Sequence, residues 1–151
     1  MTTPNIIAAV QTKWDAMTAG NFPSSTVPTL YFDEAPQVNG SGTQIFPETA
    51  GYAVVKSTSG ISIAYAFGVY GKETERLEFE IYYPSFGDCM QAARAVQTEF
   101  DFSTLPALAT PLVLLAIRPR TSSEAMAGIG KTGVPVHVAK LGYDFEFTRS
   151  G

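Results

Sequence analysis

The chain of 151 residues is 45% hydrophobic and 12% aromatic, which is enough apolar material for one core and predicts a single domain over residues 1–151. Its formal net charge of −4 argues against a general nucleic-acid binder, which needs a basic surface. One cysteine excludes an internal disulfide and a cysteine-based metal cluster, and the sequence shows neither a membrane span nor a signal peptide.

The first predicted element is an amphipathic helix. Thr3 and Pro4 suit a helix start, and Gly20 suits a stop. The apolar residues that recur between them at helical spacing are Ile6, Ile7, Val10, Trp14 and Met17. This spacing predicts that Trp14 packs in the core.

Strands follow the first helix. Short strands are predicted at residues 29–32 and 52–55, with a long loop over residues 37–51 between them. An alternation over residues 60–71 then predicts one arm of a hairpin. Its large members are Ile61, Ile63, Tyr65, Phe67 and Val69.

Residues 75–102 are the most regular stretch of the sequence. A strand over residues 76–83 alternates polar residues with Leu77, Phe79, Ile81 and Tyr83, so one face is predicted to be buried. Ser85 is predicted to cap a helix that follows. The apolar stripe of this helix consists of Phe86, Cys89, Met90, Ala93, Val96 and Phe100, with Cys89 interpreted as a small buried hydrophobe. The strand and the helix can bury these sides against each other.

The last third of the chain contains two predicted strands. An apolar run over residues 112–117 predicts a strand covered on both faces, and the polar, glycine-rich residues 119–133 predict a loop. Val134, Val136 and Val138 alternate, Tyr143, Phe145 and Phe147 continue with the phase shifted, and a bulge near Gly142 explains the shift. The order of helix, about four strands, helix and two strands predicts an α+β fold, a mainly antiparallel sheet with two helices packed on one face.

Three polar patterns suggest chemistry, and each has a simpler interpretation. Residues 125–132 fit a relaxed phosphate-loop pattern, but Gly133 follows where the helix of that motif should continue, so a flexible glycine loop is predicted. The single histidine, His137, is predicted to face solvent or lie at an edge. Glu78 and Glu80 share a strand face, and a solvated face is favoured over a catalytic pair. We therefore predict no catalytic residue, no cofactor, no metal site and no enzyme activity.

Five features in chain order carry a resemblance to a known family. They are the helix over residues 6–17, the segment 30–36, the strand at Tyr52, the strand–serine–helix unit 77–101 and the closing strand 143–147. Together they resemble the tail terminator (tail completion) proteins of long-tailed bacteriophages, a head–tail joining family. The resemblance covers nearly the whole chain and transfers no functional residue.

The resemblance implies a virion structural protein. Such a protein forms a homomeric ring, by the resemblance a hexamer, that caps the tail tube and joins it to the neck connector. Genomic DNA only passes through the ring lumen, and no membrane is involved. The implied location is the tail or neck of the virion, after assembly in the host cytoplasm. Two alternatives stay open: another neck component, such as a head-completion or stopper protein, and a small nucleotide-binding module around Gly128 to Thr132.

The candidate assembly interface comes from two segments rich in glycine and small polar residues, 57–71 and 120–133. We expect both to be mobile in the free subunit and to become ordered on docking. The candidate residues are Ile61, Ile63, Tyr65, Phe67, Val69, Arg120 and Lys131. The apolar ones are predicted to become buried against a neighbouring subunit or the tube, and the two cations to contact an acidic partner surface.

Overall fold

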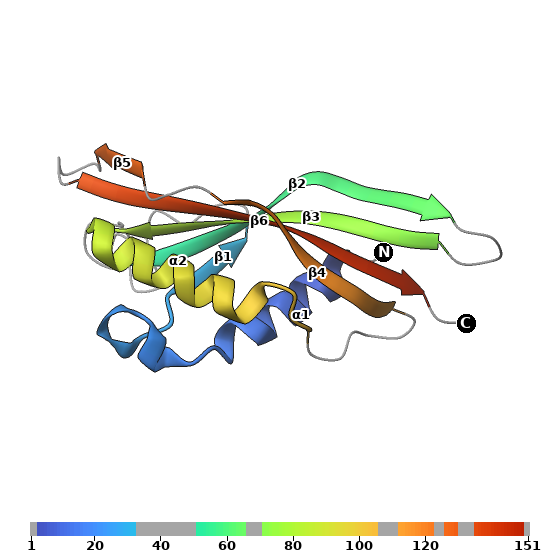
Figure 1. Ribbon diagram of the computed structural model, residues 1–151, viewed down its shortest axis with the longest axis horizontal. Coiled ribbons are helices and arrows are strands. Elements are labelled where there is room, and N and C mark those ends of the chain that lie inside the picture. Colours follow the sequence, from blue (N-terminus) through green and yellow to red (C-terminus); the bar gives the residue numbers. More distant parts are fainter. Residues whose placement is uncertain are drawn as a thin grey trace.

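The computed structural model describes residues 3–32, 51–65, 71–105, 112–122, 126–129 and 135–149 of the chain. Its elements are α1 (Thr3–Asp15), the 3-10 turns η1 (Ala19–Asn21) and η2 (Pro23–Ser25), β1 (Thr29–Phe32), β2 (Tyr52–Tyr65), β3 (Gly71–Tyr83), α2 (Phe86–Phe100), β4 (Leu112–Ser122), β5 (Met126–Ile129) and β6 (Pro135–Arg149). The strands of this described part form one sheet in the order β1-β2-β3-β6-β4, with β5 also paired to β6. β1 and β2 run parallel, and the other described pairs are antiparallel. Both helices lie on one face of the sheet (Figure 1), so the predicted α+β fold is confirmed.

The strand–helix unit predicted at the centre of the chain is confirmed as β3 and α2. Ser85 Oγ accepts a hydrogen bond from the Asp88 amide at 3.2 Å, so capping begins α2 where predicted. The buried residues of α2 are Cys89, Ala92, Ala93, Ala95, Val96 and Phe100. Burial raises the pKa of Cys89 to about 11, in keeping with its interpretation as a buried hydrophobe. Phe86 departs from the predicted stripe: it occupies the first helical position, is 51% exposed and meets the ring of His137.

The core lies between the helices and the inner face of the sheet, and Phe79 of β3 stands at its centre. The fully buried Phe79 ring stacks on Trp14 of α1 at 5.4 Å between centroids. It also meets Phe100 of α2 at 5.0 Å and Tyr143 of β6 at 6.0 Å. Trp14 Nε1 donates to the Pro28 carbonyl at 2.7 Å, which satisfies its polar atom on burial. The predicted core position of Trp14 is therefore confirmed.

Several predicted element boundaries are wrong. β2 is one strand where two were predicted, and its pairing with β3 shifts register between Ser57 and Ile61, within the Ser/Gly-rich stretch that separated the two predictions. In the described part of the chain, three strands precede α2 where about four were predicted, and three follow it, because β5 occupies part of the predicted 119–133 loop. α1 ends at Asp15, before the predicted stop at Gly20, and the chain turns there into η1.

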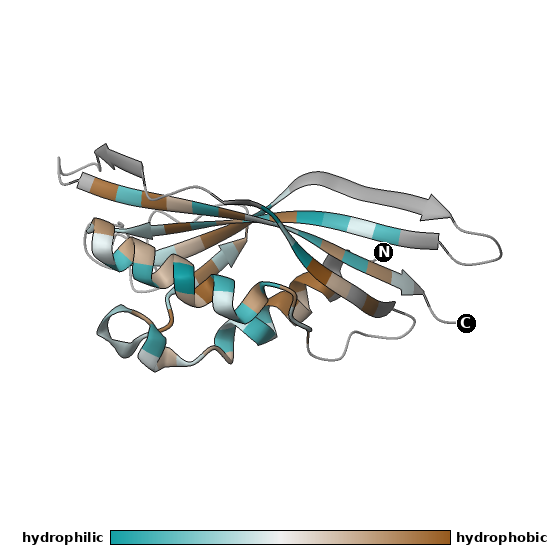
Figure 2. Ribbon diagram, in the orientation of Figure 1, coloured by the Kyte–Doolittle hydropathy of each residue, from teal (hydrophilic) through white to brown (hydrophobic). Residues whose placement is uncertain are grey.

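The predicted bulge near Gly142 lies in β4 and not in β6. β6 pairs with β3 over twelve residue pairs without a register shift. On β4 the register shifts between Pro119 and Thr121, opposite Gly142, and proline is tolerated there because β4 is the last strand in the sheet order. The inner face of β6 carries Ala139, Leu141, Tyr143, Phe145 and Phe147, and hydrophobic and hydrophilic residues alternate along the strand (Figure 2). Val136 and Val138 are half-buried on the opposite face of β6. The valines and the aromatic residues thus point to opposite sides of one regular strand, and no bulge is needed to explain the change of phase.

Beyond the aromatic core, the inner face of β3 carries two buried carboxylate side chains. Glu75 is 1% exposed and Glu73 is 7% exposed, and they stand opposite Phe145 and Phe147 of β6. The predicted strand began at Arg76, so the sequence prediction missed these two buried positions. In Figure 1 this part of β3 belongs to the long arm that β2 and β3 extend past the helices.

We expect Gly51→Ala to destabilise the fold by about 1–3 kcal/mol, as overpacking does. A Cβ at Gly51 would overlap the ring of the buried Tyr83 at the end of β3, so that ring has to move. Urea unfolding of the variant measures the loss. Gly20→Ala is the matched control, because a Cβ there meets nothing within 4 Å, and an equal loss at both positions would contradict the explanation.

Candidate assembly surface

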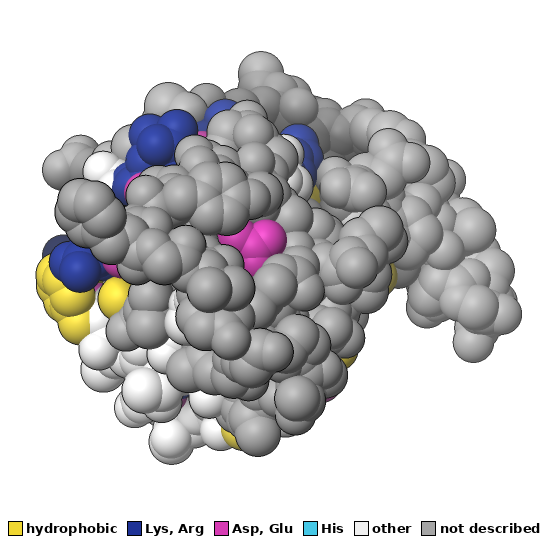
Figure 3. Space-filling model, turned by 90° about the vertical axis from the view of Figure 1, so that its right-hand side faces the viewer, with side chains coloured by type: hydrophobic (Ala, Val, Ile, Leu, Met, Phe, Trp, Pro, Cys, Tyr) yellow, Lys and Arg dark blue, Asp and Glu magenta, His cyan; other side chains and the backbone are white. Residues whose placement is uncertain are grey.

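The face of the sheet away from the helices, here called the outer face, carries a layer of ion pairs. Its cations are Lys56 of β2, Arg76 of β3, Arg118 and Arg120 of β4 and Lys140 of β6, and its paired carboxylates are Glu80 of β3 and Asp144 and Glu146 of β6. The cationic side chains are 38–58% exposed and the carboxylates 7–18%. The cations therefore form the solvent side of the layer, and Figure 3 shows Lys and Arg side chains gathered along the upper side of the molecule.

The strand register builds this layer. Asp144 of β6 stands between Arg76 of β3 and Arg118 of β4 as a cross-strand neighbour of both. Arg76 Nε and Arg120 Nε approach Asp144 Oδ1 at 3.2 and 3.4 Å. Arg118 Nε approaches Glu146 Oε1 at 2.8 Å. Such partly exposed pairs contribute little to stability because solvent screens them, so the layer sets surface charge more than stability.

Glu80 is more buried than predicted. It is 5% exposed, its carboxylate accepts a hydrogen bond from the Tyr82 hydroxyl at 2.9 Å, and it contacts Lys56 Nζ at 3.1 Å and Lys140 Nζ at 3.6 Å. Burial acts to raise the pKa of Glu80, but the bonds from Lys56 and Tyr82 and the charges of both lysines outweigh it and lower the pKa. The predicted solvated face is wrong at Glu80, because β2 and β6 cover it with lysine side chains, and Glu78 is half-buried.

Glu80→Gln is expected to lower the free energy of unfolding at pH 7 by about 1–2 kcal/mol, since hydrogen bonds to a charged group are lost. The pKa of Glu80 is lowered in the folded state, so its stabilisation is full above the ordinary value of 4.5 and is lost as pH falls through the folded pKa. Urea unfolding should therefore show a higher free energy of unfolding for the wild-type protein than for the variant at pH 7, and this difference should shrink as pH falls below 4.5. Glu78→Gln makes the same change on the same face and serves as the control. A silent Glu80→Gln at pH 7 would contradict the buried network.

Three half-buried tyrosines adjoin the ion-pair layer. Tyr52 of β2 contacts Tyr31 of β1 at 5.9 Å and Tyr82 of β3 at 5.1 Å between ring centroids. Burial and the hydrogen bond to Glu80 raise the pKa of Tyr82 well above its usual range. Tyrosine and arginine are both enriched in protein interfaces, and the outer face offers both.

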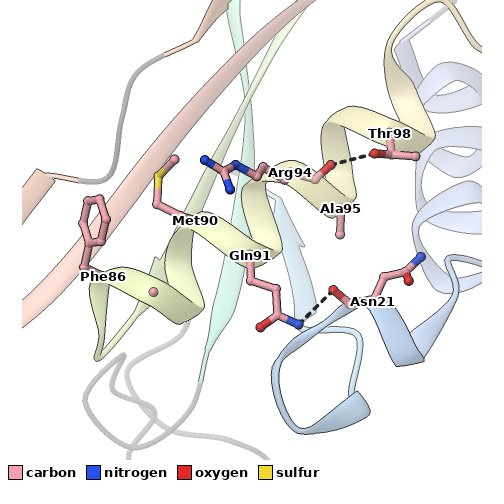
Figure 4. Close-up of a pocket in the computed structure, with 8 residues that line it drawn as sticks. Asn21, Phe86, Met90, Gln91, Arg94, Ala95 and Thr98 are labelled. Atoms are coloured by element: carbon pink, nitrogen blue, oxygen red, sulfur yellow. Dashed lines mark hydrogen bonds between the residues drawn. The ribbon is translucent and has the colours of Figure 1, made fainter.

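A second surface feature is a groove along α2 (Figure 4). Its volume is about 710 Å³, and it is lined by Asn21, Phe86, Gly87, Met90, Gln91, Arg94, Ala95 and Thr98. Gln91 Nε2 donates to the Asn21 carbonyl at 3.2 Å, which ties α2 to η1 at the groove wall.

Within the described ranges, His, Cys, Asp and Glu form no group of three that could hold a metal ion. The described part of the chain also has no helix with the length and apolarity needed to cross a membrane.

The predicted interface residues fall into two separate groups. Ile61 and Ile63 of β2 stand opposite Glu75 and Glu73 of β3, and Tyr65 stands opposite Gly71. Arg120 lies on β4, which β3 and β6 separate from β2, so these groups do not meet within one subunit. Phe67, Val69 and Lys131 lie outside the described residues. The sequence prediction of the interface did not include Lys56, Arg76, Arg118 and Lys140. Each of them lies at a polar position in the alternation of its strand, and this pattern could have identified them.

The phosphate-loop pattern falls partly on a strand. Residues 126–129 form β5, and Ile129 pairs with Pro135 of β6. Only five residues separate these paired positions, too few for the helix that follows a phosphate loop. The predicted flexible loop is wrong for residues 126–129, because β6 offers them a backbone partner.

His137 is neither solvent-facing nor at an edge. It lies in β6 between Tyr83 of β3 and Ala127 of β5, and it is half-buried. Its ring meets Phe86 edge-on at 6.0 Å between centroids. The valine alternation that suggested an exposed position continues on the opposite face of the strand.

Comparison with known proteins adds a structural likeness. No family model matches the sequence, and no curated protein matches it. Among solved structures, a chain of the virion of a native gene transfer agent (GTA) particle matches with a TM-score of 0.66 and 15% identity. The match covers 97% of this chain and 97% of that chain. At this identity the likeness shows a shared fold.

Proposed function

We propose that this protein is a structural component of a phage-like virion. The observation that carries the proposal is the fold likeness to a chain of a GTA virion, which spans 97% of both chains. The likeness thus extends over the whole domain and is not confined to one motif. The outer face, with its exposed cations and half-buried tyrosines, supports a role in assembly with other proteins.

Within the virion, we propose that it is the tail terminator: a hexameric ring that caps the tail tube, joins it to the neck connector and lets DNA pass through its lumen. The order of elements along the sequence supports this role. The open sheet also supports a ring, because its edge strands need cover and a closed ring can shield one edge of every subunit.

Electron microscopy of complete particles carrying labelled protein tests the proposal, together with binding to assembled tail tubes and to portal-bearing heads. We expect a ring at the top of the tail and binding to tubes. A single copy, or a different protein at that position, would contradict the terminator role. Binding to heads alone would indicate a head-completion or stopper protein instead.

We also propose that the protein acts without catalysis and without a nucleotide. The hairpin of β5 and β6 supports this, since it occupies the site of the phosphate-loop pattern. Calorimetry with ATP and GTP in the presence of magnesium is expected to show no binding. Micromolar affinity that is lost in Lys131→Ala would contradict this proposal.

A further inference from the structure

The outer face and the helix layer carry opposite charge. Among the described side chains, the outer face holds five cations against four carboxylates, counting Glu78, whose place in the β3 alternation puts it beside Glu80. The helix layer has the opposite sign, since residues 3–25 and 85–105 contain four carboxylates and two cations. A second copy of the chain is therefore electrostatically complementary to the outer face.

The acidic charge of the helix layer gathers where both helices end. This helix-end patch consists of Asp15, the last residue of α1, Glu99 in the last turn of α2, and Asp101, the C-cap of α2. The two ends adjoin, since the rings of Trp14 and Phe100 lie 6.3 Å apart. Lys13 stands beside them, with Nζ donating to Ser103 Oγ at 2.9 Å. A helix C-terminus carries partial negative charge, so carboxylates there oppose the helix dipole and a cationic partner relieves that repulsion.

The outer face keeps donors for such carboxylates. The three guanidiniums approach their own carboxylates through Nε, and each guanidinium carries four further N–H groups. Arg118 is the most exposed of them, at 58%. Guanidinium and carboxylate groups pair in a directional, often bidentate geometry, which fixes orientation as well as attraction.

We propose that the outer face of one subunit binds the helix-end patch of a second copy of this chain. The inference rests on the proposed ring and adds which surfaces meet in it. The helices and the outer face lie on opposite sides of the sheet (Figure 1), so the contact is heterologous and repeats from subunit to subunit. A heterologous contact closes into a ring when its rotation permits.

Sedimentation velocity on the whole chain tests the contact with two charge-reversed proteins. One carries Arg118→Glu on the outer face, and the other carries Asp15→Lys with Glu99→Lys in the patch. Asp101 is left unchanged because it accepts the Tyr143 hydroxyl at 2.5 Å. Wild-type protein is expected to associate at low salt, and less as salt rises. Each variant alone should lose association about tenfold or more, and an equimolar mixture should restore it, because each then offers the surface that the other lacks.

Arg94→Glu is the matched control for Arg118→Glu, with the same charge change on the exposed side of α2; it makes the helix layer more acidic, so it should not weaken association. If Arg118→Glu fails to fold, Arg118→Gln replaces it and should weaken association. Wild-type protein that stays monomeric at low salt overturns the proposal, as does a folded variant pair whose mixture stays monomeric. Binding of a DNA duplex that depends on Arg118, without self-association, would also overturn it and assign the face to nucleic acid.

The result is separable from the test of the virion role. Protein found at the top of the tail, combined with failed restoration in the mixture, removes this contact and leaves the function standing. Restored association, combined with absence from complete particles, removes the function and leaves the contact.

Discussion

Replacement of Phe79 by alanine is expected to lower the free energy of unfolding by about 3–5 kcal/mol. Phe79 is fully buried at the junction of both helices and the sheet, where its ring meets those of Trp14, Phe100 and Tyr143. The truncation leaves a cavity that no single element can close, because the rings around it belong to three different elements, α1, α2 and β6. Urea unfolding at pH 7 measures the loss.

Phe102→Ala makes the same chemical change where the side chain is 74% exposed. It is expected to stay within about 0.5 kcal/mol of wild type. Comparable losses at Phe79 and Phe102 would show that the aromatic cluster is not the centre of the core.

Val96→Asp is expected to cost about 4 kcal/mol or more, enough to unfold a domain of ordinary stability. Val96 is fully buried on the sheet-facing side of α2, so an ionised carboxylate there loses its hydration within an apolar stripe. Circular dichroism and thermal unfolding measure the effect. The deficit should shrink as pH falls, because burial raises the pKa of the new carboxyl and its neutral form is tolerated better.

Thr98→Asp introduces the same group two residues further along α2 at an exposed position. It is expected to change stability by about 0.5 kcal/mol at most. A variant pair with equal melting temperatures would contradict the assigned orientation of α2.

Local periodicity predicted the elements whose burial follows from their own alternation. The inner residues of β3 and the stripe of α2 between Cys89 and Phe100 are examples, because each contains a full period of two or of 3.6. β5 was missed because its four residues have no period of their own and become a strand only through pairing with β6. The merger of the two strands predicted within β2 likewise depends on β3, which pairs with both parts across the register shift at Ser57.

The outer face shows a different limit of sequence reasoning. Alternation placed Glu78 and Glu80 on one side of a strand, and the structure keeps that assignment. Burial of Glu80, however, depends on Lys56 and Lys140, which come from strands on either side of β3. A one-dimensional pattern tells which side a residue faces, whereas the strand order decides which charges meet there.

The position of β6 in the sheet has a consequence for folding. This strand lies between β3 and the pair β4 and β5, yet it follows all of them along the chain. β3 at residues 71–83 must therefore find a partner at residues 135–149, a pairing of high sequence separation that favours slow folding. During synthesis, β4 and β5 emerge before the strand on which both depend. The nascent chain thus exposes unpaired strand edges until β6 is complete. We expect it to be most prone to aggregation, and most accessible to chaperones, during that interval.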